Sequence, residues 1–245
     1  MSLTIPEYEV LAEVYDRWTA ANDYESWCDH IQRRVPRTAS LLDLCCGTGT
    51  MTRLLQRRGF AVAGVDSSAA MLRRARAILP PGTVLWQQDL SVPSSVPQTF
   101  DALVCCFDSV NYFIEETELD ALFGFASGAL RPEGVFVFDV NTKHKLAAVF
   151  GNSHYGDDLG QFAYVWRNRY DADLHNVEFL ISLYMECGGV FQRHEIRHVQ
   201  RWLSHDMLRA LAMKHGFDVV EVSDDYSDRP VCADTLRETW VLARR

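Results

Sequence analysis

The hydrophobic positions of the chain repeat with two different periods, and these periods divide it into segments. Leu41–Cys45 and Phe100–Phe107 are short apolar runs next to turn residues, which predicts buried strands. Elsewhere apolar residues recur every three or four positions, as at Leu119, Leu122 and Phe123, which predicts amphipathic helices. Strands that alternate with helices indicate a parallel sheet with helices on both faces.

Applied to the whole chain, the two periods predict seven core strands and six helices. The expected strands are Leu41–Cys45, Ala61–Val65, Val84–Gln87, Phe100–Phe107, Gly134–Val140, Val219–Val222 and Leu236–Leu242. The expected helices are one that carries Leu11, Tyr15 and Trp18, then Tyr24–Arg34, Thr50–Arg58, one from Ser67 or Ser68 to Leu79, one capped by Thr117, and one from Ser204 to His215.

The segment 141–203 follows a different pattern. Phe162, Tyr164 and Trp166 alternate with other residues, which predicts antiparallel strands with one apolar face. We expect a three-stranded meander here, inserted into a single domain that spans 1–245. Its aromatic face either walls the acceptor site or forms a dimer contact. The expected organisation is an N-terminal helical lid (1–36), a cofactor-binding core (37–140), this insertion (141–203), and the last helix and strands of the core (204–245).

A glycine-containing turn after the first strand carries the clearest chemistry. Gly47-Thr48-Gly49 joins a buried strand to a helix, and glycine lets backbone pass close to a ligand. Asp66, which ends the next strand, can bond a ribose hydroxyl. Thr52 stands where a dinucleotide fingerprint has its third glycine, which argues against an NAD-dependent oxidoreductase, and no phosphate-binding P-loop sequence is present. The pattern predicts a nucleoside cofactor.

Five segments, in order, resemble the motifs of class I S-adenosylmethionine-dependent methyltransferases. They are the glycine turn, Asp66 to Leu72, Gln88 to Leu90, Phe100 to Val104, and Leu130 to Val135. The resemblance covers residues 1–140 and 204–245. It implies an α/β fold with a doubly wound, mostly parallel, Rossmann-like sheet of seven strands whose last strand is antiparallel. It also implies S-adenosyl-L-methionine as cofactor and S-adenosyl-L-homocysteine as product.

The same resemblance assigns roles to individual residues. Asp66 is expected at the ribose hydroxyls, Met71 near the adenine, and Asp89 at the adenine amine. On the residues alone, Asp66 could instead cap the following helix and Asp89 a turn. The full expected cofactor set is Cys45, Gly47, Thr48, Gly49, Asp66, Ser67, Met71, Asp89, Leu90, Cys106 and Phe107, with Tyr15 and Trp18 from the lid.

The segment Asp108–Phe113 looks more like bacterial small-molecule N-methyltransferases of amino sugars and antibiotics than like nucleic-acid amine methylases. This favours an amine acceptor and a role in bacterial natural-product chemistry. An amine needs little more than positioning, whereas a hydroxyl needs a base. O-methylation of a small hydroxyl metabolite therefore stays open. The candidate catalytic residues are Tyr15, Asn111, Tyr112 and His144, and Tyr155, Trp166 and His194 are further pocket candidates.

The composition limits the kinds of partner that we expect for this chain. The net charge is −9, which argues against nucleic acid as a partner, and no apolar run is long enough to cross a membrane. The seven cysteines lack metal-site spacing and are expected to be small buried hydrophobes in a reducing compartment. We expect a cytoplasmic monomer or homodimer that acts on a small-molecule acceptor and holds no metal.

Two further alternatives come from other classes. His194-Glu195-Ile196-Arg197-His198 matches H-E-x-x-H, the motif of zinc metalloproteases, in which the two histidines bind zinc from one face of a helix and Glu195 would be the general base. The neighbouring alternation predicts a strand here, where positions four apart are too distant to share an ion. The other alternative is a module that binds the nucleoside without catalysis.

Overall fold

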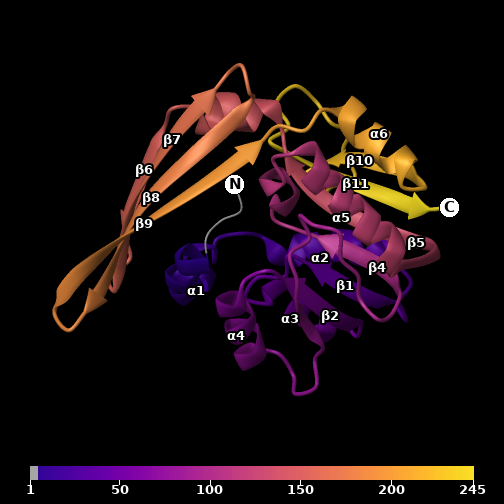
Figure 1. Ribbon diagram of the computed structural model, residues 1–245, viewed down its shortest axis with the longest axis horizontal. Helices are drawn as coiled ribbons and strands as arrows, with labels where there is room; N and C mark the ends of the chain where they lie inside the picture. The colour runs from indigo at the N-terminus through magenta and orange to yellow at the C-terminus, as the bar shows by residue number, and fades with distance from the viewer. Residues whose placement is uncertain (1–4) are drawn as a thin grey trace.

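The computed structural model describes residues 5–245, which form two β-sheets with helices packed around the larger one (Figure 1). The strands are β1 Ser40–Leu44, β2 Ala61–Asp66, β3 Leu85–Gln87, β4 Phe100–Cys105, β5 Leu130–Asn141, β6 His154–Asp158, β7 Phe162–Asp171, β8 Asn176–Cys187, β9 Val190–Arg201, β10 Phe217–Asp224 and β11 Arg237–Arg244. The helices are α1 Ile5–Trp18, α2 Tyr24–Arg34, α3 Thr50–Arg57, α4 Ala69–Ile78, η1 Ser109–Tyr112, α5 Glu116–Ala129, η2 Lys145–Phe150 and α6 His205–Lys214.

The larger sheet has the strand order β10-β11-β5-β4-β1-β2-β3. Its strands are parallel except β11, which runs antiparallel to both β10 and β5. The predicted seven-stranded, mostly parallel sheet with an antiparallel last strand is therefore confirmed. The order of the strands reverses between β1 and β4, and in open α/β sheets ligands bind at the carboxyl ends of the strands at such a point.

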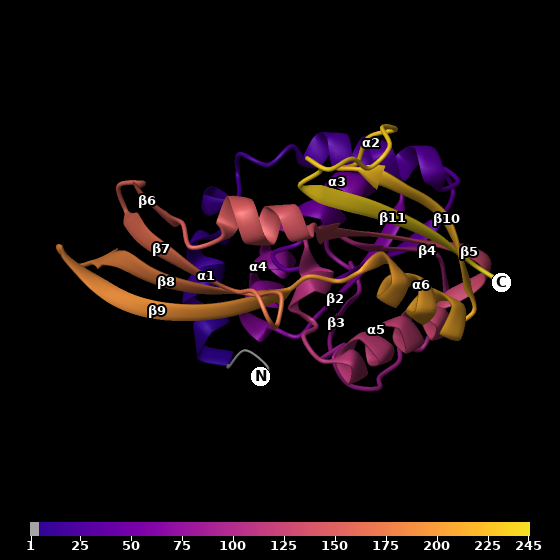
Figure 2. The same ribbon diagram turned by 90° about the horizontal axis from the view of Figure 1, so that it is seen from above.

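Apolar side chains cover both faces of this sheet, as the continuous hydrophobic runs predicted. Helices α2 and α3 lie on one face and α5 and α6 on the other (Figure 2). On the second face Phe123, Phe136, Phe138 and Trp240 are fully buried and their rings touch. This core holds the carboxyl ends of the central strands in fixed positions.

The inserted sheet contains four antiparallel strands, β6-β7-β8-β9, so the prediction of three was wrong. The missed strand, β6, is exposed at all its residues and shows no apolar alternation. It is a strand because its backbone pairs with β7. An edge strand with no buried face needs no alternation of apolar residues, so the sequence did not indicate it. The short π-helical segment η2 was also not predicted.

Helix α1 lies between the core and the inserted sheet (Figure 1). Its Leu11 and Val14 pack in one cluster with Met71 of α4 and with Phe162 and Ile181 of the inserted sheet. No described helix is long and apolar enough to span a membrane. Because α1 contacts both parts, it closes the space between the two sheets on one side.

Candidate active site

A cavity of about 890 Å³ opens at the carboxyl ends of β1, β2 and β4. Helix α1 and strands β8 and β9 of the inserted sheet form its other walls. The volume lies within the range of small-molecule and cofactor sites, roughly 300–1,000 Å³. The cavity therefore sits at the switch point of the sheet order and extends to the inserted sheet.

The glycine turn fixes the carboxylate of Asp66 at one end of this cavity. The backbone N–H of Gly47 donates to Oδ2 of Asp66 at 2.8 Å, and the N–H of Ser68 donates to Oδ1 at 2.8 Å. Burial raises the pKa of Asp66, and the backbone N–H groups oppose that rise. Gly47 has a positive φ of 54°, and a Cβ built on it would meet nothing within 4 Å. The turn thus leaves open space beside an oriented carboxylate.

Most of the residues expected to contact cofactor line the cavity, but three do not. The side chain of Thr48 donates to Oδ1 of Asp16 on α1, which ties the turn to that helix. Gly49 has φ 83° and faces Ala75 so closely that a Cβ would lie 3.1 Å away. Cys106 is buried, and its carbonyl accepts from Ser109 at 2.9 Å. Those that line the cavity are Tyr15, Trp18, Cys45, Gly47, Asp66, Ser67, Met71, Asp89, Leu90 and Phe107.

Strained backbone clusters at the cavity. Cys45, Phe107 and Asp108 have φ values of 54°, 65° and 49°, a left-handed region that non-glycine residues rarely occupy. All three line the cavity, at the ends of the adjacent strands β1 and β4. Such strain tends to concentrate at ligand sites, where surrounding packing holds it in place.

The donor set fits a nucleoside with a cationic centre. Asp66 and Asp89 supply carboxylate oxygens for hydroxyl and amine hydrogens, and Tyr15 and Phe107 supply aromatic rings whose centroids lie 6.4 Å apart. Oδ1 of Asp89 accepts from Ser91, and among the described residues its Oδ2 has no hydrogen-bond donor. The residues present therefore suit S-adenosylmethionine.

Asp43, inside β1, has a structural contact. Its side chain is buried, and Oδ2 accepts from the hydroxyl of Thr52 at 2.6 Å. Thr52, which stands where a dinucleotide fingerprint has its third glycine, thus donates a hydrogen bond to strand β1. Burial raises the pKa of Asp43 to about 7, and the Thr52 bond opposes the rise.

Asp43→Asn should flatten the pH dependence of stability. The folded-state pKa of about 7 lies above the ordinary value of 3.8, so the folded state binds more protons between these values. Stability linked to Asp43 is thus largest below pH 4 and is lost as pH rises through 7. The urea midpoint of the wild type should fall more between pH 5 and 8 than that of Asp43→Asn. Equal slopes for the two proteins would contradict this.

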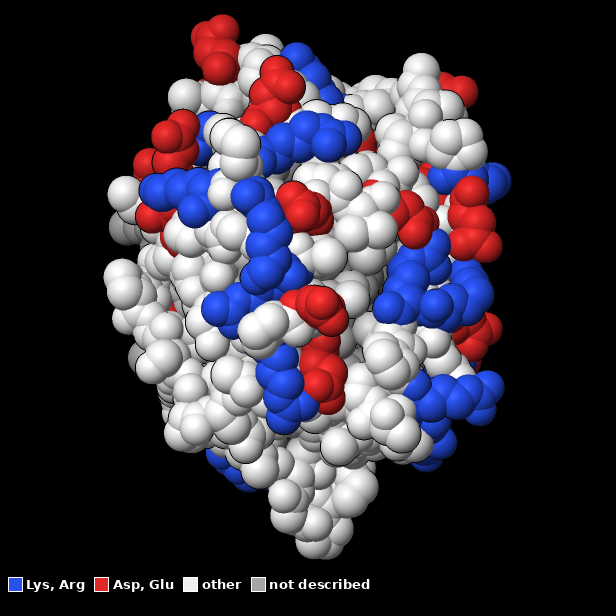
Figure 3. Space-filling view, turned by 90° about the vertical axis from the view of Figure 1, so that its right-hand side faces the viewer, with Lys and Arg blue, Asp and Glu red and all other residues white. Residues whose placement is uncertain are grey.

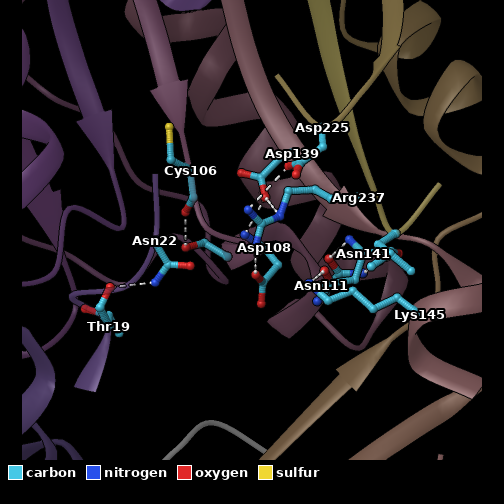
Figure 4. A network of polar contacts seen from close by, with 12 residues as sticks. Thr19, Asn22, Cys106, Asp108, Asn111, Asp139, Asn141, Lys145, Asp225 and Arg237 are labelled. Atoms are coloured by element: carbon cyan, nitrogen blue, oxygen red, sulfur yellow. Dashed lines mark hydrogen bonds and ion pairs between the residues drawn. The ribbon is translucent and has the colours of Figure 1, made fainter. Parts of the chain in front are cut away.

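An ion-pair network around Arg237 contributes Asp108 and Arg237 to the lining of the cavity (Figure 4). Arg237 of β11 contacts Asp139 of β5 at 3.0 Å and Asp108 at 3.1 Å, and Asp225 lies 3.6 Å away. Oδ1 of Asp139 accepts from the hydroxyl of Tyr226 at 2.7 Å. Burial raises the pKa of Asp139 to about 6, and Arg237 opposes this rise. These contacts orient Asp108 at the end of β4.

The network continues into the inserted sheet. Nε2 of Gln200 on β9 donates to Oδ2 of Asp108, and its Oε1 accepts from Nδ2 of Asn141 at 2.8 Å. Oδ1 of Asn141 in turn accepts from Nζ of Lys145 at 2.7 Å (Figure 4). Polar contacts therefore connect the core strands directly to the sheet that closes the cavity.

The four candidate catalytic residues separate into two pairs. Tyr15 and Tyr112 line the cavity. Asn111 is buried behind it, where its Nδ2 donates to the carbonyl of Arg201 at 2.9 Å and its Oδ1 accepts from the N–H of Asn141 at 2.8 Å. His144 is exposed and does not line the cavity. Of the further candidates, Trp166 lines the cavity, whereas Tyr155 and His194 do not.

Five cavity residues were not among the expected site residues, although Asp108 begins the segment compared with small-molecule N-methyltransferases and His198 belongs to the H-E-x-x-H match. Asp108, Lys145, His198, Gln200 and Arg237 line the cavity from segments far apart in the chain. Nδ1 of His198 lies 3.4 Å from the hydroxyl of Tyr112, and burial lowers the pKa of His198 to about 4. A further signal was a charged residue, Asp139, inside the otherwise apolar run of β5, because buried carboxylates need partners.

The H-E-x-x-H segment lies on β9, which confirms the strand prediction. On this strand His194 and His198 are four positions apart, about 13 Å at ~3.3 Å per residue, which is too far for both to bind one ion. Within residues 5–245, no group of three or more His, Cys, Asp or Glu side chains is placed to hold a metal ion. Four of the seven free thiols are buried, as expected, whereas Cys45 is half-buried and two thiols are exposed. The buried ones are Cys28, Cys46, Cys105 and Cys106, and the exposed ones are Cys187 and Cys232.

Known proteins share both the sequence and the fold. A family model described as a methyltransferase domain matches residues 18–222. YqeM of Bacillus subtilis, a protein named as a methyltransferase, is 30% identical over 232 residues, which cover 94% of each chain. The crystal structure of an S-adenosylmethionine-dependent methyltransferase from Clostridium acetobutylicum is 29% identical, covers 97% of this chain and 98% of its own, and has a TM-score of 0.83.

A sugar-modifying enzyme is also similar over part of the chain. The dTDP-3-amino-3,6-dideoxy-α-D-glucopyranose N,N-dimethyltransferase of Streptomyces fradiae is 36% identical over 109 residues, or 44% of this chain and 42% of its own. The whole-chain matches include the inserted sheet, so the family likeness extends beyond the segments expected from motifs alone. The chain belongs to the family of S-adenosylmethionine-dependent methyltransferases.

Proposed function

We propose that this methyltransferase transfers its methyl group to an amine nitrogen of a small molecule. The observation that supports this most is the carboxylate of Asp108, which lines the cavity between the cofactor-binding turn and the inserted sheet. A carboxylate there attracts an amine and accepts its N–H hydrogens.

S-adenosylmethionine, when bound, supplies a methyl group on an already activated sulfonium. We assign its ribose hydroxyls to Asp66, its adenine to Asp89, Leu90 and Met71, and its methionine part to the turn at Gly47. Tyr15 and Phe107 give this region an aromatic lining, and aromatic faces attract cations. Ser67, Cys45 and Trp18 complete the wall of the proposed cofactor site.

The acceptor half of the cavity has the chemistry for an amine. Each oxygen of Asp108 already accepts one hydrogen bond, from Arg237 and from Gln200, and a carboxylate oxygen can accept a second. Asp108 can therefore hold an acceptor amine by its N–H hydrogens without losing its own support. An amine of pKa about 9 is roughly 1% neutral at pH 7, which costs about 2.7 kcal/mol. Positioning can supply about 7–11 kcal/mol, so such an amine needs no strong base.

A hydroxyl acceptor is the alternative that the site makes less favourable. It would need a base, and the histidine of the cavity, His198, has a pKa lowered by burial to about 4. A base with so low a pKa removes a hydroxyl proton poorly. Tyr112 is equally unsuited, since burial raises its pKa above the ordinary value and keeps its hydroxyl protonated.

The surface supports a small acceptor rather than nucleic acid. On the face shown in Figure 3, Asp and Glu side chains lie among the Lys and Arg side chains, and the net charge of the chain is −9. Proteins that bind nucleic acid concentrate basic side chains along one face.

The proposal is tested with radiolabelled S-adenosylmethionine and matched pairs of small amines and alcohols. We expect label in the amines, including amino sugars, and none in the paired alcohols. Label only in alcohols would establish the O-methyltransferase alternative. S-adenosylhomocysteine binding without any methyl transfer would favour a non-catalytic nucleoside-binding module.

Asp108→Asn should lower kcat/KM for amines by roughly 10–100-fold, because it weakens a charge-assisted hydrogen bond worth about 1.5–3 kcal/mol. Affinity for S-adenosylhomocysteine, measured by calorimetry, should stay within about twofold of the wild type. Equal loss of both quantities would place Asp108 in the cofactor site instead.

A further inference from the structure

The cavity contains one basic side chain without a carboxylate partner. Lys145, on η2, lines the cavity and is largely buried. No described carboxylate lies within ion-pair distance of its Nζ, whereas Arg237 and Arg197 of the same cavity are both paired. Burying a charge is expensive unless something compensates it.

The hydrogen bonds of Lys145 are also incomplete. Its ammonium has three donors, and the amide oxygen of Asn141 accepts one at 2.7 Å. The nearby carboxylates are already engaged, because Arg237 and Gln200 hold Asp108 while Tyr226 and Arg237 hold Asp139. Two donors of Lys145 thus remain for a ligand.

Three aromatic rings lie beside this ammonium. Phe150, Trp166 and Phe179 line the cavity, with ring centroids 5.2–5.8 Å apart. Nζ of Lys145 lies 5.3 Å from the ring centroid of Phe150. We call these three rings the aromatic wall. A cation next to an apolar surface suits a molecule that carries an anionic group on an apolar body.

We propose that the acceptor of this enzyme carries an anionic group, a carboxylate or a phosphate, that binds Lys145 while its apolar body packs on the aromatic wall. This inference rests on the proposed function, since it describes the acceptor of that reaction. Lys145 then binds the anionic end of the substrate while Asp108 accepts the N–H hydrogens of the neutral amine, which fixes the direction of the substrate and presents the amine to the methyl group. Helix α1 and the core strands alone would not bind the anionic group, because η2 and the aromatic wall belong to segment 141–203.

The test uses small probes and needs no methyl transfer. The full chain, saturated with S-adenosylhomocysteine, is titrated by calorimetry with phenylacetate, its neutral analogue phenylacetamide, and phenyl phosphate. We expect each anion to bind at least about tenfold more tightly than the amide, and Lys145→Met to remove that preference. The tighter of the two anions shows whether a carboxylate or a phosphate is preferred.

Lys143→Met is the matched control, because Lys143 is exposed and lies outside the cavity lining. It should keep the preference for anions. If Lys145→Met lowers Tm, Lys145→Gln replaces it, since a glutamine amide can still donate to Asn141. Equal affinity for all probes in the wild type, or a preference that persists without Lys145, overturns the inference. Neither of these two results would contradict amine methylation. If the methylation screen fails instead, the calorimetry still shows whether Lys145 binds an anion.

Discussion

Asp66→Ala should abolish measurable binding of S-adenosylhomocysteine. The carboxylate lines the cavity, and two backbone N–H groups orient it. The loss of two hydrogen bonds that the proposed ribose hydroxyls donate to this carboxylate amounts to about 3–6 kcal/mol, or roughly 10²–10⁴-fold in affinity. Calorimetry on the purified variant measures the loss.

Asp101→Asn is the control for this experiment. Asp101 is the second residue of β4, at the end of the strand away from the cavity, where it accepts from the N–H of Ser40 at 2.7 Å and pairs with Arg131. Its loss should affect stability and leave cofactor affinity unchanged. Asp66→Asn checks folding, because the amide oxygen can still accept from Gly47 or Ser68. Unchanged affinity in Asp66→Ala would place the cofactor elsewhere.

Arg237→Met should destabilise the folded protein by about 3–5 kcal/mol, because it leaves buried carboxylates without their counter-charge. Arg237 is buried and faces Asp108, Asp139 and Asp225. For a chain of this length, that free energy corresponds to a fall in Tm of roughly 10 °C. Thermal unfolding followed by circular dichroism measures it.

The size of this effect should depend on pH in a defined direction. The folded-state pKa of Asp139 is about 6, above the ordinary 3.8, so ionised Asp139 disfavours the folded state as pH rises through 6. Without Arg237 the pKa of Asp139 rises further. At low pH Asp139 is therefore protonated in the variant, and its buried charge no longer destabilises the folded state. The stability difference between wild type and Arg237→Met should therefore be larger at pH 8 than at pH 5.

Arg229→Met provides the surface comparison. Arg229 is exposed and pairs with Asp224 at 2.9 Å. Exposed pairs contribute about 0–1 kcal/mol, so this variant should unfold close to the wild type at both pH values. A difference that stays the same at pH 5 and 8 for Arg237→Met would show that Asp139 does not titrate with the assigned shift.

The sequence by itself determined the core fold, and it placed Gly47 and Asp66 at the ends of neighbouring strands, where we propose that the cofactor binds. A short, mostly apolar run next to a glycine turn, such as Leu41–Leu44, predicts a strand covered on both faces, and all four of its residues, Asp43 included, are buried. Gly47 and Asp66 are separated by one strand and one helix, so local order along the chain already places them together. The proposed roles of Gly47 and Asp66 therefore depend only on residues that are near one another in the sequence.

Only the tertiary structure decided the acceptor side. Asp108 and Arg237 are 129 positions apart, and nothing in either local segment indicates their ion pair. The fully exposed strand β6 shows no hydrophobic alternation, and Lys145 lies on a short helical turn that periodicity does not predict. Pairing between strands that are distant in the sequence brings these side chains to one cavity. The periodicity of a sequence indicates which residues are buried, but it does not indicate which distant residues contact one another.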